Sequence, residues 1–339
     1  MSLVIEGLDI AEAPVLVEVT RGDMVESRHA GTVAVVDAKG GVRISCGNAG
    51  QPIYPRSAIK PIQALALLES GAAERYKLGD AEIALACASH GGEKRHVETV
   101  RAWLARIGLS EDDLECGGHA PSFAGAAEEL FRAGGQITPA HNNCSGKHTG
   151  FLTVAKHRGW PTRGYIREDH PLQQTILKTL ADLSGSDLAS GARGTDGCGI
   201  PVVGIPLDRL ALAMARIADP SGLRPERVAA IKRIRRAMAA EPFMVAGTGR
   251  FCTRVMTKLG EQAIVKTGAE GVYMAALPTL GLGVCLKIVD GAGRAAQVLL
   301  AAVFQRLGLP DVRELATAPI SNVVGKPVGV VRPASDLPF

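Results

Sequence analysis

Aromatic residues are scarce in this sequence: Phe, Trp and Tyr together make up 4% of its 339 residues. Proteins that bind single-stranded nucleic acids stack bases on aromatic side chains, so this scarcity argues against that class. The formal net charge of +4 is small and spread along the chain, which argues against nucleic acid as a partner. With 46% hydrophobic and 21% charged residues, the composition is typical of a globular protein.

The sequence also lacks a long apolar run. No stretch approaches the roughly 18 consecutive apolar residues that a membrane-spanning helix needs. Residues 1–14 contain Glu6, Asp9 and Glu12 but no basic residue, which does not fit a secretory signal. We therefore expect no membrane association and a cytoplasmic location.

Cysteines do not form a recognisable disulfide pattern. Their number is odd and their spacing irregular, so a disulfide framework is not expected, in agreement with a reducing compartment. The seven are Cys46, Cys87, Cys116, Cys144, Cys198, Cys252 and Cys285.

Strand-like patterns lie towards both ends of the sequence, and helical patterns fill the middle. This order predicts an α+β fold in which an antiparallel sheet packs with helices. The sheet is expected from residues of about 15–50 and 260–335, and the helical lobe from residues of about 57–245. Because no repeat or linker interrupts the chain, we expect a single domain over residues 1–339.

A serine and a lysine three positions apart stand at the start of a predicted helix, in Arg56-Ser57-Ala58-Ile59-Lys60-Pro61. Residues three apart share one helix face, so the Lys60 amine could reach the Ser57 hydroxyl. An uncharged lysine can accept the proton of such a serine and make it a nucleophile. Alone the motif is common, and a capping serine followed by a solvated lysine explains it equally well.

Two further segments add candidates. Ser89-His90-Gly91-Gly92 follows a predicted helix, either as a simple C-terminal stop or as a second serine beside a ligand. Lys266-Thr267-Gly268 ends an apolar strand. An S-x-x-K motif followed by a K-T-G strand is typical of serine acyl-transfer enzymes of the penicillin-recognising kind, although this chain lacks their S-x-N box.

A third cluster is split between Asn142-Asn143-Cys144-Ser145-Gly146-Lys147-His148 and Asp196-Gly197-Cys198-Gly199. Cysteine, aspartate, lysine and histidine in glycine-rich loops suggest a metal site, but the spacing fits no standard zinc finger. For any single cysteine in the chain, a small buried hydrophobic role is the alternative.

Taken together, these segments resemble the rhizobial-type, or class 3, L-asparaginases of the asparaginase II family. The match includes Lys266-Thr267-Gly268-Ala269-Glu270-Gly271, and the segments follow the family's order over most of the chain. The resemblance implies a fold like that of serine β-lactamases and penicillin-binding proteins, and a homodimer. It also implies hydrolysis of L-asparagine to L-aspartate and ammonia.

The same resemblance implies roles for individual residues. Ser57 would be the nucleophile with Lys60 as its base, and Ser89 with Lys266 would form a second serine–lysine pair. One Zn²⁺ would be held beside Asp196 by Cys144, Lys147 and Cys198.

Charge and position suggest how a small zwitterionic substrate would bind. Arg56 and His148 are candidates for its carboxylate, and Glu270 or Asp196 for its ammonium group. Arg56 could equally be a surface residue, and Glu270 could cap a turn. A free lysine is protonated at neutral pH, so a lysine base needs a lowered pKa. For Lys60, burial together with the positive charge of Lys266 is expected to lower the pKa.

Two rival functions stay open at this stage. Glutaminase is close, because the serine–lysine and K-T-G segments occur there as well, and one methylene discriminates by only about 1–3 kcal/mol. A zinc-stabilised protein that binds an amino acid without turning it over is the non-enzymatic alternative.

Overall fold

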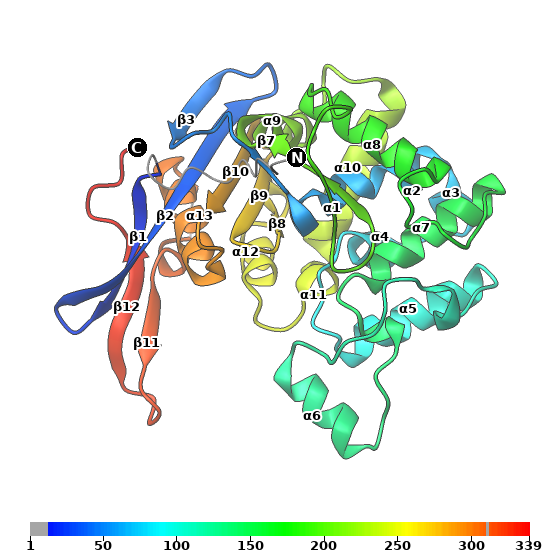
Figure 1. The fold of residues 1–339 in the computed structure, drawn as a ribbon, viewed down its shortest axis with the longest axis horizontal. Helices are drawn as coiled ribbons and strands as arrows, with labels where there is room; N and C mark the ends of the chain where they lie inside the picture. The colour runs from blue at the N-terminus through cyan, green and yellow to red at the C-terminus, as the bar shows by residue number, and fades with distance from the viewer. Residues whose placement is uncertain (1–12, 310–311) are drawn as a thin grey trace, which may run out of the picture.

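The computed structural model describes residues 13–309 and 312–339 (Figure 1). Residues 1–12, which carry most of the segment judged not to be a secretory signal, lie outside the described residues. Among the described helices, none is long and apolar enough to cross a membrane.

Within the described residues, eight strands form one antiparallel sheet in the order β11-β12-β1-β2-β10-β9-β8, with β3 paired to β2. The N-terminal part of the chain supplies β1, β2 and β3, and the C-terminal part supplies β8 to β12. The strands are β1 (Val15–Arg21), β2 (Met24–Asp37), β3 (Val42–Cys46), β8 (Ile264–Thr267), β9 (Val272–Leu277), β10 (Leu282–Ile288), β11 (Ala318–Ser321) and β12 (Pro327–Pro333).

Helices cover the sheet. Every residue of β9 and β10 is buried, as expected for strands with both faces covered. Helices α9 (Leu207–Ala218) and α13 (Gly293–Arg306) pack against it. At Gly283 a side chain would collide with the α9 backbone, since an added Cβ would lie 2.1 Å from the Ala211 carbonyl oxygen. Glycine therefore lets this helix approach the sheet closely.

The other helices lie beside the sheet, as Figure 1 shows. They include α4 (Asp80–Ala86), α5 (Lys94–Arg106), α6 (Ala124–Arg132), α7 (Ser145–Arg158), α8 (Pro171–Ser184), α10 (Pro225–Ala240), α11 (Pro242–Ala246) and α12 (Phe251–Leu259). Residues 145–155 of α7 are all buried, so this helix runs through the interior of the helical part. The α+β prediction is confirmed; whether the chain forms one domain stays a prediction.

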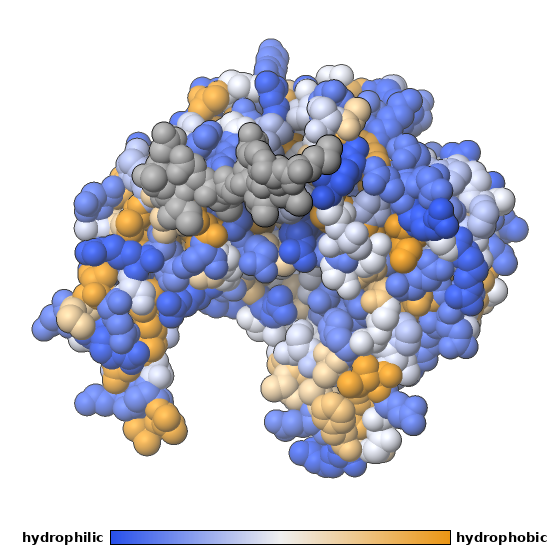
Figure 2. Space-filling model, viewed as in Figure 1, coloured by the Kyte–Doolittle hydropathy of each residue, from blue (hydrophilic) through white to orange (hydrophobic). Residues whose placement is uncertain are grey.

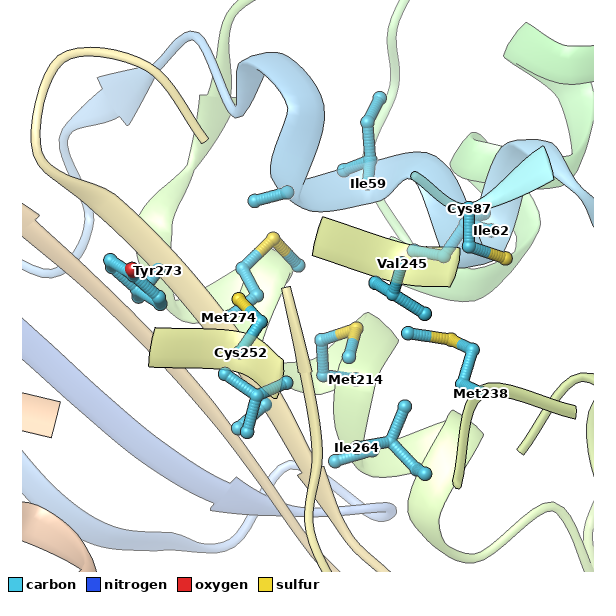
Figure 3. Packing of buried hydrophobic residues seen from close by; sticks show 14 of the residues in the cluster. Ile59, Ile62, Cys87, Met214, Met238, Val245, Cys252, Ile264, Tyr273 and Met274 are labelled. Atoms are coloured by element: carbon cyan, nitrogen blue, oxygen red, sulfur yellow. The ribbon is translucent and has the colours of Figure 1, made fainter. Parts of the chain in front are cut away.

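A shared core joins the helical part to the sheet. Figure 3 shows Ile62 and Met238 from helices in the same region as Ile264 and Met274 from strands. Burial of these apolar side chains is the main force that holds the two parts together. It also fixes the chain around residues 56–62 against β8.

The segment after Pro55 differs from the expected continuous helix. Residues Arg56–Ile59 form a 3-10 helix (η2), followed by short helices α1 (Lys60–Gln63) and α2 (Leu65–Glu69). Pro61 stands in the first turn of α1. Proline is tolerated there but has no N–H for an earlier carbonyl, which explains why the regular helix begins only at Lys60.

Candidate active site

Two buried lysine amines meet at the hydroxyl of Ser89. The Nζ atom of Lys60 lies 3.0 Å from Ser89 Oγ, and that of Lys266 lies 2.9 Å from it. Both lysines are 1% exposed, whereas Ser89 is half-buried. Two amines and a hydroxyl from distant parts of the sequence are thus brought together at one point.

Each member of this cluster comes from a different element. Lys60 opens α1, Lys266 lies in β8, and Ser89 follows α4 and donates its backbone N–H to the Val245 carbonyl at 3.0 Å. Gly268 lets the end of β8 reach η2, because an added Cβ would lie 2.7 Å from the Pro55 carbonyl oxygen. The glycine of the K-T-G segment is therefore a requirement of close packing.

Of the two serine–lysine pairs expected from the sequence, one is within hydrogen-bond distance and the other is not hydrogen-bonded among the described residues. Ser89 and Lys266 lie within hydrogen-bond distance, but within the described part of the chain no hydrogen bond joins Ser57 to Lys60. The Lys60 amine instead contacts the Ala88 carbonyl, Ser89 and the Cys144 sulfur. Those three acceptors match the three N–H donors of a lysine ammonium, leaving none for Ser57.

Ser57 itself is half-buried in η2. Its neighbours Pro55 and Ala58 flank Gly268, so Ser57 stands beside the end of the strand that carries Lys266. Among the described residues its hydroxyl forms no hydrogen bond with Ser89 or Lys266. A free oxygen on a half-exposed serine stays accessible to a substrate.

The lowered pKa in this cluster belongs to Lys266. Burial lowers it to about 7, and the positive charge of Lys60 adds to the effect. From the sequence, the neutral amine is expected at Lys60 and the neighbouring charge at Lys266. The structure supports the same electrostatic principle, with the lowered pKa at the other lysine.

Two cysteines and a lysine form a second cluster. Lys147 Nζ lies 3.0 Å from Cys198 Sγ, and the Cys198 thiol is placed to donate to the Cys144 sulfur. Cys144 directly precedes α7, and Lys147 is one turn further on. Cys198 lies in a turn closed by the Gly199 N–H, which donates to the Asp196 carbonyl at 2.8 Å.

The charges in this second cluster are shared. The hydrogen bond from the Cys198 thiol, together with the positive charges of Lys60 and Lys147, lowers the pKa of Cys144 well below its usual value. The same hydrogen bond raises the pKa of Cys198. Burial alone would lower the pKa of Lys147, but the cysteine charges raise it.

The donor set fits a metal such as zinc only if the lysine takes part. In the described residues, no group of three or more His, Cys, Asp or Glu side chains could hold a metal ion. Cys144 and Cys198 supply two sulfurs, and the Lys147 amine supplies a nitrogen. Catalytic zinc sites also have three protein donors, but these are His, Cys, Asp or Glu, so a lysine donor here would be unusual.

Lys60 connects the two clusters. Its Nζ atom lies 3.1 Å from Cys144 Sγ and 3.0 Å from Ser89 Oγ. A change at the sulfur cluster can therefore reach the serine through a single side chain.

The residues expected to bind substrate are placed as follows. Arg56 and Asp196 form an ion pair, with 2.8 Å between the guanidinium and a carboxylate oxygen. His148 does not fit its expected role, because burial keeps its pKa well below the usual value and it carries no positive charge for a carboxylate. It bonds instead with the buried Tyr165 hydroxyl at 2.7 Å. Glu270 is exposed in the turn after β8.

Asn142 has a structural part in the site that sequence reasoning missed. Its side-chain amide donates to the carbonyls of Cys116 and Gly117 at 2.9 and 3.0 Å, and its side-chain oxygen accepts the Cys144 N–H at 2.8 Å. These bonds fix the loop that presents Cys144. The available signal was the pair of asparagines directly before that cysteine.

Comparison with solved structures gives distant likenesses. Mglu in its native form is 15% identical with a TM-score of 0.47, and the match covers 83% of this chain and 65% of Mglu. A putative β-lactamase from Bacteroides dorei DSM 17855 is 14% identical with a TM-score of 0.45, over 81% and 92% of the two chains. The D-alanine carboxypeptidase AmpC from Burkholderia cenocepacia is 12% identical with a TM-score of 0.41, over 82% and 93%. These likenesses assign no activity to this chain.

Family membership rests on the sequence match. No curated protein is significantly similar to the chain. The model of the L-asparaginase II family, however, matches residues 17–333, a range that includes both lysines, both serines and the sulfur cluster. The chain therefore belongs to the L-asparaginase II family, whose members are asparaginase-type amidohydrolases.

Proposed function

We propose that this protein is an L-asparaginase that hydrolyses the side-chain amide of L-asparagine to L-aspartate and ammonia through a serine nucleophile. The observation that carries the proposal is the meeting of Lys60 and Lys266 at Ser89, with the pKa of Lys266 lowered to about 7. At neutral pH a substantial fraction of such an amine is unprotonated and can accept a proton from a hydroxyl.

Ser57 is proposed as the attacking residue, with Ser89 as its proton relay. The Ser89 oxygen lies within hydrogen-bond distance of both the Lys60 and the Lys266 amines. When Lys266 is neutral, its lone pair can accept the Ser89 proton while Lys60 still donates to the Ser89 oxygen. Its remaining lone pair is free to take the Ser57 proton as Ser89 passes its own proton to Lys266. The relay requires the Ser57 hydroxyl to turn towards Ser89 when substrate binds.

The bonds balance over two steps. The Ser57 oxygen bonds to the side-chain carbonyl carbon of asparagine, and the C–N bond of the amide breaks. The proton held by Lys266 returns through Ser89 to the departing nitrogen, which leaves as ammonia. Water then attacks the resulting ester by the same relay and releases aspartate and the free serine.

Arg56 and Asp196 are proposed to contact the charged groups of the substrate. They are paired with each other in the structure, with side chains 26% and 12% exposed. An amino-acid zwitterion carries one charge of each sign and can therefore replace each residue's present partner. Glu270 remains a second candidate for the ammonium group.

We also propose that Cys144, Lys147 and Cys198 hold one zinc ion. When bound, zinc would supply Lewis-acid polarisation or an anchor for a charged group of the substrate. Lys147 must lose its proton to act as a ligand, so zinc binding is expected to release protons.

Replacing Lys147 tests the zinc proposal. We expect Lys147→Leu to weaken zinc affinity at least about 100-fold, because an aliphatic side chain offers no donor atom to a metal. Lys156→Leu, at the exposed end of the same helix, should leave affinity unchanged. Metal analysis after dialysis against a graded chelator gives the readout, and equal zinc retention in both variants would remove Lys147 from the ligand set.

The substrate is tested by comparing two amides. Ammonia release from L-asparagine and L-glutamine, measured as kcat/KM, should favour asparagine by about 10- to 200-fold, the discrimination that one methylene allows in a fitted pocket. A reversed preference would make the protein a glutaminase. Binding of asparagine without any ammonia would favour the amino-acid-binding alternative.

The lowered pKa of Lys266 predicts a pH dependence. The base acts in its neutral form, whose fraction rises as the pH rises through about 7. We expect kcat to increase about tenfold per pH unit on the acidic side and to level off above pH of about 8. Steady-state rates measured in overlapping buffers check this, and a profile flat from pH of about 6 to 10 would contradict a lysine base.

A homodimer is proposed as well. Exposed apolar side chains gather on two projecting parts of the molecule, at the lower left and lower right of Figure 2. The tip between β11 and β12 exposes Val323 and Val324, and α6 exposes Phe131 (57%). Exposed apolar patches of this kind mark protein interfaces. Sedimentation of the purified protein tests this proposal, and a monomer would contradict it.

A cytoplasmic location stays a prediction.

A further inference from the structure

His90, next to Ser89, is completely buried and bonded at both ring nitrogens. Its Nδ1 atom lies 3.1 Å from the backbone nitrogen of Gly92, and its Nε2 atom lies 2.9 Å from Ser145 Oγ. Gly92 belongs to the loop of Ser89, whereas Ser145 is the first residue of α7, directly after Cys144. The ring therefore joins the loop that carries the serine to the helix that begins at the sulfur cluster.

The hydrogen bonds determine which ring nitrogen carries the proton. The Gly92 N–H can only donate, so Nδ1 is the acceptor and has no hydrogen. Nε2 then carries the proton and donates it to Ser145 Oγ. The Ser145 hydroxyl donates in turn to the Ala140 carbonyl at 2.9 Å. Each donor in this row of hydrogen bonds therefore has one acceptor. Burial, helped by His96, keeps the pKa of His90 far below its usual value and the ring neutral.

One face of the His90 ring is packed as well as its edges. His96 stacks on His90 with 4.8 Å between ring centroids and an angle of 11°. Phe243 stacks on the other side of His96 at 4.5 Å and 7°. The backbone N–H of His90 also donates to the Asn143 carbonyl at 3.2 Å. The imidazole thus has little freedom to rotate or shift.

We propose that His90 is a positioning residue, which holds the Ser89 hydroxyl at the two lysine amines by locking the Ser89 loop to the start of α7. The inference rests on the proposed function and adds to it a residue that touches neither substrate nor metal. Lys60 must reach both Ser89 and Cys144, so the spacing between the loop and the start of α7 decides whether both contacts exist together. His90 sets that spacing.

Two substitutions of His90 separate the bond to Ser145 from simple packing. The His90→Asn variant can still accept from Gly92 but is too short to reach Ser145, and we expect kcat to fall about 10- to 100-fold with KM little changed. The His90→Gln variant places an amide N–H near the former Nε2 and should recover part of the lost kcat. Equal rates for both variants, or a loss confined to KM, would overturn the proposal.

Ser145→Ala tests the same bond from the other side. Its effect on kcat should match that of His90→Asn, and the double variant should lose no more than either single one, because all remove one interaction. Additive losses would contradict the coupling. Thr149→Val is the matched control: Thr149 is buried on the same helix and donates to the Ser145 carbonyl at 2.9 Å, and among the described residues it forms no hydrogen bond with the Ser89 loop. It should lower thermal stability without lowering kcat.

A crystal structure of the His90→Asn variant gives a readout that does not depend on substrate. Ser89 Oγ is expected to lie beyond hydrogen-bond distance of at least one lysine amine, whereas an unmoved Ser89 would overturn the positioning role. If the unaltered protein releases no ammonia from asparagine, the proposed function fails, and the position of Ser89 in this structure still decides the role of His90.

Discussion

Replacing Lys266 by methionine is expected to lower kcat for L-asparagine by about 10²–10⁴-fold, the contribution that a positioned general base makes. Methionine has a similar length and is apolar, so it suits a residue that is 1% exposed. The fold should survive, because the substitution removes a buried amine that has two hydrogen-bond partners among the described residues, Ser89 and the Thr267 carbonyl. Ammonia release under saturating asparagine measures the effect.

Lys266→Arg separates proton transfer from charge. Arginine keeps the positive charge but does not lose its proton in proteins, so it cannot act as a base. We expect this variant to be about as inactive as Lys266→Met. Substantial activity in Lys266→Arg would show that the site needs a cation there rather than a base, and the proposed relay would be wrong.

Ser57→Ala is expected to remove turnover almost completely, by about 10³-fold or more, since no other group would then form the covalent intermediate. Ser89→Ala should be severe but smaller, about 10²-fold, because it breaks the relay while leaving the attacking oxygen in place. Both serines are half-buried, so neither change opens a large cavity.

The acylated serine distinguishes the two roles. Rapid acid quenching followed by peptide mass analysis should find the aspartyl ester on Ser57 in the unaltered protein and in Ser89→Ala. An ester on Ser89, with Ser57→Ala still active, would reverse the assignment and make Ser89 the nucleophile. That outcome would keep Lys266 as the base, because Lys266 is already within 2.9 Å of Ser89.

Local patterns predicted most of the regular elements. The strand-like runs that form β1, β9 and β10 lie inside the two ranges expected for the sheet, about 15–50 and 260–335. The change from the 3-10 helix η2 to the α-helix α1 at Lys60 was harder to predict, since Pro61 permits a helix start at several positions. β12 pairs with β1 more than 300 residues away, and no short-range pattern carries that information.

The site was predicted in its members but not in its contacts. Spacing along one helix suggested that Lys60 serves Ser57, three residues away. Folding instead places the Lys60 amine against Ser89 and Cys144, which are 29 and 84 residues away. Burial decides which residues the Lys60 amine bonds to, because a buried amine needs hydrogen-bond acceptors and the tertiary structure determines which ones are near. His148 was expected to contact the substrate, but the tertiary structure places it in the interior, which its position in the sequence does not reveal.

The charge state of the lysine follows the same logic. From the sequence, one of the two amines has to be neutral and Lys60 is the expected one, but the outcome depends on burial and on neighbours from other elements. The structure gives Lys266 the lowered pKa through burial and the charge of Lys60.

Titration of the Lys266 side chain tests the central claim most directly. Nuclear magnetic resonance of protein labelled with ¹³C at the lysine Cε, with Lys266→Arg used to assign the signal, follows the protonation of this amine without substrate. A midpoint near pH 7 is the predicted result. A midpoint near the ordinary lysine value of about 10.4 would contradict the account, since the amine would then be protonated at neutral pH and unable to activate a serine.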